Sequence, residues 1–97
     1  MNIIGKGTDI MKGIRFGVGI FPMYHAEQTI GLAKLGEDLG YDSLWVGDSH
    51  LIWREVGILL GAIAKQTARV RIGTGVTHIG VRHVTVTASS IATLAEL

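Results

Sequence analysis

The sequence predicts an α/β fold, namely the first three βα units of a (β/α)8 TIM barrel, and two observations support this prediction. The first is that strand-like segments begin near residues 14, 43 and 70, and that a helical segment follows each of them. These starts lie 29 and 27 residues apart, which is the length of a βα unit repeated in a parallel sheet. Eight such units would give roughly 225 residues, within the usual range of these barrels, so a chain of 97 residues makes an incomplete one.

The second observation is that the two faces of the predicted strands differ in character. One face is aliphatic and would pack under the helices; it carries Ile14, Phe16, Val18, Ile20, Leu44, Val46, Val70 and Ile72. The other face is smaller and more polar, which suits a barrel interior; it carries Arg15, Gly17, Gly19, Ser43, Trp45, Gly47, Arg71, Gly73 and Gly75. An open doubly wound sheet meets helices on both faces, so both would then be aliphatic. We therefore expect helices on one face and strands in the order one, two, three.

The first βα unit is expected to consist of a strand over 14–20 and a helix over 26–39. In the strand, aliphatic residues alternate with small or polar ones, which is a period of two. In the helix, a face expected to be buried recurs at helical spacing; it comprises Leu32, Leu35, Gly36 and Leu39. Gly40 follows at the position where a left-handed residue commonly ends a helix.

The second and third units follow without a linker. A short strand over 43–47, partly β-branched and aromatic, leads through a polar loop to a helix over 56–67. The third strand is expected over 70–76, and the third helix from about residue 85 to residue 97.

Composition excludes several classes of protein. The chain is 47% hydrophobic and 18% charged, with a mean hydropathy of +0.39, which is too apolar for a disordered chain. Its formal charge of +1 comes without a run of Lys or Arg, so we expect no nucleic acid and no membrane among its partners. No secretory signal is visible, and we expect a cytoplasmic protein. Cysteine is absent, which excludes disulfides and thiolate metal sites.

Polar side chains gather in the segments that follow the predicted strands, where barrels build their active sites. All four histidines fall in or beside these segments: His25, His50, His78 and His83. The densest segment is 48–55, which holds a carboxylate, an imidazole, an indole and a guanidinium within eight residues. Asp48 and His50 are therefore the candidate catalytic groups, as side chains that can handle protons.

Two other interpretations of these residues are open at this stage. In a structural one, Asp48 or Ser49 caps a turn, Trp53 packs under the loop, and Arg54 pairs with Glu55 or Asp48. In a metal-binding one, ligands come together from adjacent loops for metal-assisted hydrolysis; they would be Asp48, His50, His78 and His83. No His-x-His pair ends the first strand, which disfavours the metal-binding interpretation.

The stretch 72–76 is a second candidate site. Gly73 and Gly75 remove side chains where a backbone or a ligand must approach closely, so a planar ring could rest against this strand end. The stretch lacks the third glycine and the helix start of a dinucleotide-binding motif. The alternative explanation of the glycines is a crowded barrel interior or a bulge.

Four stretches together resemble the N-terminal portion of the bacterial luciferase-like superfamily, in its deazaflavin-dependent reductase branch of the methylenetetrahydromethanopterin reductase type. They are residues 40–55, 69–77, 82–83 and 90–97, and their order and spacing carry the resemblance. It covers residues 12–97, which leaves 1–11 as an N-terminal extension. The family fold is a (β/α)8 barrel, which agrees with the strand pattern.

The resemblance also implies a function. Hydride would pass between a deazaflavin coenzyme of the F420 type and a small-molecule substrate, with Asp48 and His50 near the ring. Thr74, Gly75 and Val76 would support the ring, and a non-proline cis peptide would fall at Gly75-Val76. An FMN-dependent monooxygenase fragment is the alternative within the family, and a non-catalytic half-barrel is the alternative outside catalysis.

The resemblance further implies that this chain holds only part of the family's barrel. Strands four to eight would supply barrel closure and most of the binding site. We therefore expect the chain to be inactive alone, and to self-associate or to pair with a chain that supplies the missing units, because a sheet with two open edges invites association.

Overall fold

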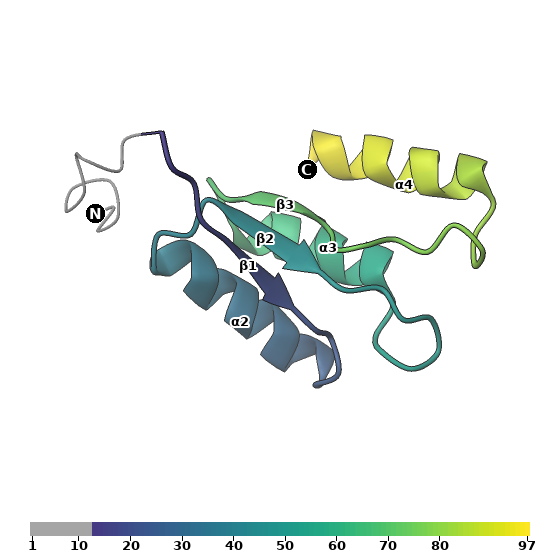
Figure 1. The fold of residues 1–97 in the computed structure, drawn as a ribbon, viewed down its shortest axis with the longest axis horizontal. Coiled ribbons are helices and arrows are strands. Elements are labelled where there is room, and N and C mark those ends of the chain that lie inside the picture. Colours follow the sequence, from purple (N-terminus) through teal and green to yellow (C-terminus); the bar gives the residue numbers. More distant parts are fainter. Residues whose placement is uncertain (1–12) are drawn as a thin grey trace.

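The computed structural model describes residues 13–97, so the expected extension over 1–11 lies outside the described residues. The described chain alternates strands and helices (Figure 1). Its elements are β1 (Gly17–Ile20), α2 (Ala26–Asp38), β2 (Ser43–Val46), α3 (Val56–Gln66), β3 (Arg71–Thr74) and α4 (Val84–Glu96). Within this part of the chain, no helix combines the length and the apolar character needed to cross a membrane.

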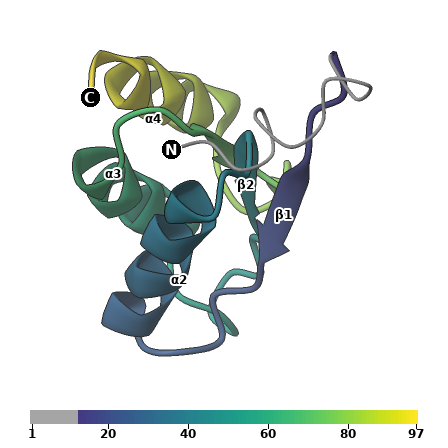
Figure 2. The same cartoon turned by 90° about the vertical axis from the view of Figure 1, so that its left-hand side faces the viewer.

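The three strands form one parallel sheet in the order β1-β2-β3, as predicted. Leu44 of β2 pairs with Val18 on one side and Ile72 on the other, so these side chains share a face. Helices α2 and α3 both lie on one side of the sheet, and the opposite face is open (Figure 2). The predicted arrangement of three βα units is confirmed.

The first strand is shorter than the predicted 14–20, and the reason is local. Strand β2 begins at Ser43, so residues before Gly17 have no strand partner. Instead, the Phe16 N–H donates to the Asp42 carboxylate at 2.8 Å, and the Phe16 carbonyl accepts the Asp42 N–H at 2.8 Å. The side chain and the backbone N–H of Asp42 thus take the two hydrogen bonds that Phe16 would have made in a longer strand.

The core lies between the aliphatic face of the sheet and the two helices that cover it. Its buried members are Ile20, Ala33, Leu44, Val46, Val56, Leu60 and Ile63. Val18, Val70 and Ile72 pack partly buried against it, whereas Ile14 is 53% exposed and lies outside. From Val18 onward, the strand residues predicted to form the aliphatic face therefore do face the helices.

The buried face predicted for the first helix is right at Gly36 and wrong at its leucines. Helix α2 buries Thr29 and Ala33 together with Gly36, whereas its leucines at 32, 35 and 39 are 43%, 50% and 52% exposed. Small residues occupy the buried face because they let the helix backbone approach the sheet closely: a Cβ added at Gly36 would lie 2.8 Å from Cδ2 of Leu44. The leucines line a groove of about 390 Å³ beside β1.

This exposed apolar surface predicts self-association. The leucines of α2 lie next to the outer edge of β1, and Trp45 on the open face of the sheet is 48% exposed. Unpaired strand edges and apolar patches of this kind favour contacts between chains. We expect sedimentation analysis to show oligomers whose population rises with concentration. A stable monomer over a wide concentration range would contradict this expectation.

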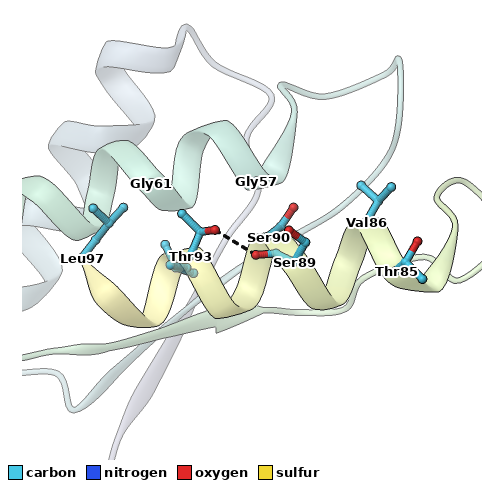
Figure 3. Close-up of a pocket in the computed structure, with 9 residues that line it drawn as sticks. Gly57, Gly61, Thr85, Val86, Ser89, Ser90, Thr93 and Leu97 are labelled. Carbon is cyan, nitrogen blue, oxygen red and sulfur yellow. Dashed lines mark hydrogen bonds between the residues drawn. The ribbon is translucent and has the colours of Figure 1, made fainter.

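Helix α4 packs loosely beside α3 and has no buried residue. A groove of about 450 Å³ runs between the two helices (Figure 3). Small residues line most of it, namely Gly57, Gly61, Thr85, Val86, Ser89, Ser90, Thr93, Leu94 and Leu97. None of these side chains is titratable in the neutral pH range, so this groove is not a candidate for acid–base chemistry.

Candidate functional site

The candidate site lies where the loops after β2 and β3 leave the same edge of the sheet. Backbone bonds continue beyond the strands here: the Gly47 N–H donates to Ile20 O at 3.0 Å and the Gly75 N–H to Val46 O at 2.8 Å. Asp48 follows two residues after the end of β2, and Gly75 follows directly after β3. The sheet thus places both predicted residues at the C-terminal ends of neighbouring strands.

Asp48 is the centre of this edge, and its side chain is 2% exposed. Its Oδ2 accepts hydrogen bonds from the Thr77 hydroxyl at 3.1 Å and from the His78 N–H at 3.1 Å. Arg82 reaches it with two donors, at 2.7 Å to Oδ2 and 3.2 Å to Oδ1. The carboxylate therefore ties the end of β2 to the whole loop that follows β3.

Arg82 also reaches a second carboxylate. Its Nη2 lies 2.8 Å from Glu55 Oε1, and the other oxygen of Glu55 accepts the Ile58 N–H at 2.8 Å and so caps helix α3. With 15% of its side chain exposed, Arg82 is largely enclosed by these partners. One guanidinium thus links the loop before α4 to the end of β2 and the start of α3.

This arrangement sets the protonation of the network. The hydrogen bonds from Arg82, helped by His78 and Thr77, lower the pKa of Asp48 to about 2 against the opposing effect of burial. Burial raises the pKa of Glu55, but bonds from the Ile58 and Gly57 backbones and from Arg82 outweigh it, and the net pKa is lowered. Asp48 is consequently an ionised acceptor at neutral pH.

The network predicts a stability that falls in acid. Because the folded pKa of Asp48, about 2, lies below the ordinary aspartate value of 3.8, the carboxylate stabilises the fold above the unfolded pKa. That stability, about 2 kcal/mol, is lost as the pH falls from 5 towards 2. Denaturant unfolding at a series of pH values measures it. The Asp48→Asn variant should lack this part of the pH dependence, and an unchanged profile in that variant would contradict the prediction.

Trp45 dominates the open face of the sheet beside this edge. Its indole lies across the strands: Cβ atoms added at Gly17 and Gly73 would lie 2.8 Å from Nε1 and 3.0 Å from Cζ3. Its Nε1 donates to the Ser43 hydroxyl at 3.0 Å, and a Cβ added at Gly75 would lie 3.1 Å from the Trp45 Cβ. The glycines that the sequence analysis singled out at 73 and 75 therefore leave room for this indole.

The other predicted site residues lie in different surroundings. His50 is exposed in the loop after β2. Gly75 and Val76 are exposed, Val76 at 79%, and the peptide bond between them is cis, as the resemblance implied. Thr74 pairs with Val46 in the sheet, so its side chain lies on the face that the helices cover, where it lines a cavity of about 330 Å³ with Thr77. Its side chain therefore does not lie on the open face.

Two of the histidines, His25 and His83, are the N-cap residues of helices α2 and α4. The His25 N–H donates to Gln28 at the beginning of α2, at 3.2 Å. His83 precedes α4, and its Nδ1 accepts the Thr85 N–H at 3.2 Å. Among residues 13–97 no three His, Asp or Glu side chains gather in a way that could hold a metal ion, so the metal-binding interpretation has no support in the fold.

The structural interpretation of segment 48–55 is partly confirmed. Trp53 does pack under the loop, with its ring 5.3 Å from that of Phe21. The predicted partner of the carboxylates is wrong, because Arg54 donates to the Met23 carbonyl at 3.4 Å, and Arg82 pairs with Asp48 instead. The available signal was that Asp48 and Arg82 both lie in segments that follow neighbouring strands.

Fold and site together define a class: three consecutive βα units of a (β/α)8 barrel, with polar groups at the C-terminal ends of the strands. Residues 12–97 match the sequence profile described as luciferase-like monooxygenase. The chain belongs to this family.

Relatives and a solved structure agree with that assignment. A 5,10-methylenetetrahydromethanopterin reductase of Methanolobus tindarius is 37% identical over 82 residues, covering 84% of this chain and 25% of the relative. A 4-hydroxyprotoasukamycin monooxygenase of Streptomyces nodosus subsp. asukaensis is 29% identical over 99 residues, covering 90% of this chain and 27% of the relative. The structure of the coenzyme F420 dependent tetrahydromethanopterin reductase of Methanopyrus kandleri matches with a TM-score of 0.78 and 32% identity, over 84% of this chain and 23% of that one. This chain therefore spans about a quarter of the length of these proteins.

Proposed function

We propose that this chain forms the N-terminal part of a deazaflavin-dependent oxidoreductase, in which the edge after β2 and β3 contacts the coenzyme ring. The observation that carries the proposal is the match to tetrahydromethanopterin reductases in sequence and in fold, one of which is described as F420 dependent. When bound, a deazaflavin supplies hydride transfer to or from a small-molecule substrate. Cytoplasmic location and pairing with a chain that supplies further barrel units stay predictions from the sequence.

The residues present fit a planar ring. Next to Gly75, whose backbone is exposed, Val76 and Trp45 present apolar side chains that are 79% and 48% exposed. Flat apolar surfaces of this kind suit an aromatic ring, and a few polar groups then fix its orientation. Gly75 and Val76 are proposed to bind the ring, and Thr74 to contribute through its backbone.

The two proposed catalytic residues differ in what they can do. His50 is exposed, and an imidazole can both donate and accept a proton, which fits a proton-handling role. Asp48 is enclosed and ionised, and its oxygens already accept four hydrogen bonds. We propose His50 for proton transfer, and Asp48 for holding the site together rather than for donating a proton.

Coenzyme titrations test this proposal. Coenzyme F420 and FMN would be titrated into the 97-residue protein, and into a chimera in which residues 13–97 replace the matching part of the Methanopyrus kandleri reductase. We expect the chimera to bind F420 more tightly than FMN. His50→Ala and Gly75→Val should each weaken F420 binding at least tenfold, the latter because a side chain at 75 meets the Trp45 Cβ.

The matched control for Gly75→Val is Gly31→Val in α2, where an added Cβ meets nothing within 4 Å. It should leave binding unchanged. If both site variants bind as tightly as the parent chimera, the site assignment is wrong. Tighter binding of FMN would favour the monooxygenase alternative, and a chimera that folds but binds neither coenzyme would refute the proposed function.

A further inference from the structure

We propose that Asp48 is a positioning residue that holds the segment 75–78, directly after β3, against the end of β2. Arg82 and Glu55 in turn hold the Asp48 carboxylate in place. The consequence for coenzyme binding rests on the proposed function, whereas the positioning of the segment itself does not.

The segment 75–78 is anchored at both of its ends. At the first end, the Gly75 N–H donates to Val46 O at 2.8 Å. At the second, the Thr77 hydroxyl and the His78 N–H both donate to Asp48 Oδ2 at 3.1 Å. Val76 between them is 79% exposed, so packing does little to fix it. The position of the proposed ring-binding residues therefore depends on these anchors.

A carboxylate is required at position 48 because every group that faces it is a donor. Thr77, His78 and two nitrogens of Arg82 all point hydrogen atoms at its two oxygens. An asparagine has the same size, but it carries no charge and has one acceptor oxygen: with that oxygen towards Thr77 and His78, its NH2 group meets Nη2 of Arg82. Asp48→Asn therefore keeps the shape but loses the ion pair with Arg82 that holds the anchor in place.

Glu37 of α2 offers a matched control, because its carboxylate holds the loop at the opposite end of β3 from segment 75–78. Its carboxylate accepts the N–H groups of Ala68, Arg69 and Val70 at 2.7 to 3.1 Å and so fixes the loop before β3. Burial raises the pKa of Glu37, but these backbone bonds outweigh it and the net pKa is lowered. Glu37→Gln thus makes the same chemical change to a loop-holding carboxylate, far from the segment 75–78.

Amide hydrogen exchange of the 97-residue protein, resolved by NMR, tests the positioning. In Asp48→Asn we expect the Gly75 and His78 amides to exchange at least tenfold faster than in the parent. In Glu37→Gln the amides of 68–70 should exchange faster, while Gly75 keeps the parent rate. Thr77→Val removes one bond only and should accelerate Gly75 exchange about threefold, which keeps the test decisive if Asp48→Asn fails to fold. An unchanged Gly75 amide in the folded variants would overturn the proposal.

F420 binding by the protein and by the chimera tests the consequence. The Asp48→Asn and Glu37→Gln variants are compared at a temperature where both are folded. Asp48→Asn should weaken F420 binding at least tenfold, and Glu37→Gln less than twofold. Equal weakening in both variants would mean a general loss of structure and would overturn the positioning role in binding. If the parents themselves bind neither coenzyme, the proposed function fails, and the amide exchange still decides whether Asp48 holds the segment.

Discussion

Replacing Leu44 by alanine is expected to lower the free energy of unfolding by about 3 kcal/mol. Leu44 is fully buried in β2, the strand that is paired on both sides, and it lies beneath Gly36 of α2. A strand held by two neighbours cannot move to fill the cavity. Because small domains have a total stability of roughly 5–15 kcal/mol, denaturant unfolding followed by circular dichroism should show a large shift of the midpoint.

Leu35→Ala is the control, since it makes the same chemical change at a side chain that is 50% exposed. It should cost less than about 1 kcal/mol, because little buried area is lost and alanine is a good helix former. Equal losses for the two variants would mean that the leucines of α2 belong to the core, as the helical periodicity alone suggested.

Replacing Arg82 by methionine is expected to cost about 3 kcal/mol at neutral pH. Its aliphatic stem would be kept, but the Asp48 carboxylate, 2% exposed, would lose its counter-charge and two of its four hydrogen bonds. Glu55 would lose its partner too. Denaturant unfolding measures the loss, and Lys34→Met is the control. Lys34 pairs with Asp38 at 3.4 Å on the exposed surface of α2, and breaking such a pair should cost less than about 1 kcal/mol.

The pH dependence of the Arg82→Met variant separates this explanation from a simple loss of packing. Arg82 is the largest cause of the lowered pKa of Asp48, so without it burial moves that pKa upwards against the remaining bonds from His78 and Thr77. The variant therefore loses stabilisation that the parent gains from Asp48 as the pH rises above the unfolded pKa. The difference in stability between the two should therefore shrink between pH 7 and pH 3. A constant difference would show that the stem of Arg82, and not its charge, carries the effect.

How far the site could be predicted depends on whether a feature is local. The sequence could place Asp48, His50 and Gly75 at one edge of the sheet because each lies in a segment that follows a strand, and parallel strands end at one edge. The bond between Asp48 and Arg82 joins residues 34 apart, in two different loops. Nothing in the segment 48–55 distinguishes Arg82 from Arg54 as a partner, since that choice depends on the paths of both loops through space.

The sequence by itself determined the alternation of strands and helices, the order of the sheet and the aliphatic face of the strands. These follow from periodicities of two and 3.6, which report the local backbone conformation. Tertiary structure alone decided that α2 buries Thr29 and Ala33 rather than its leucines, and that Trp45 fills the space above Gly17 and Gly73. The physical reason is that burial depends on how closely two backbones approach, and this distance is set by side chains far apart in the sequence.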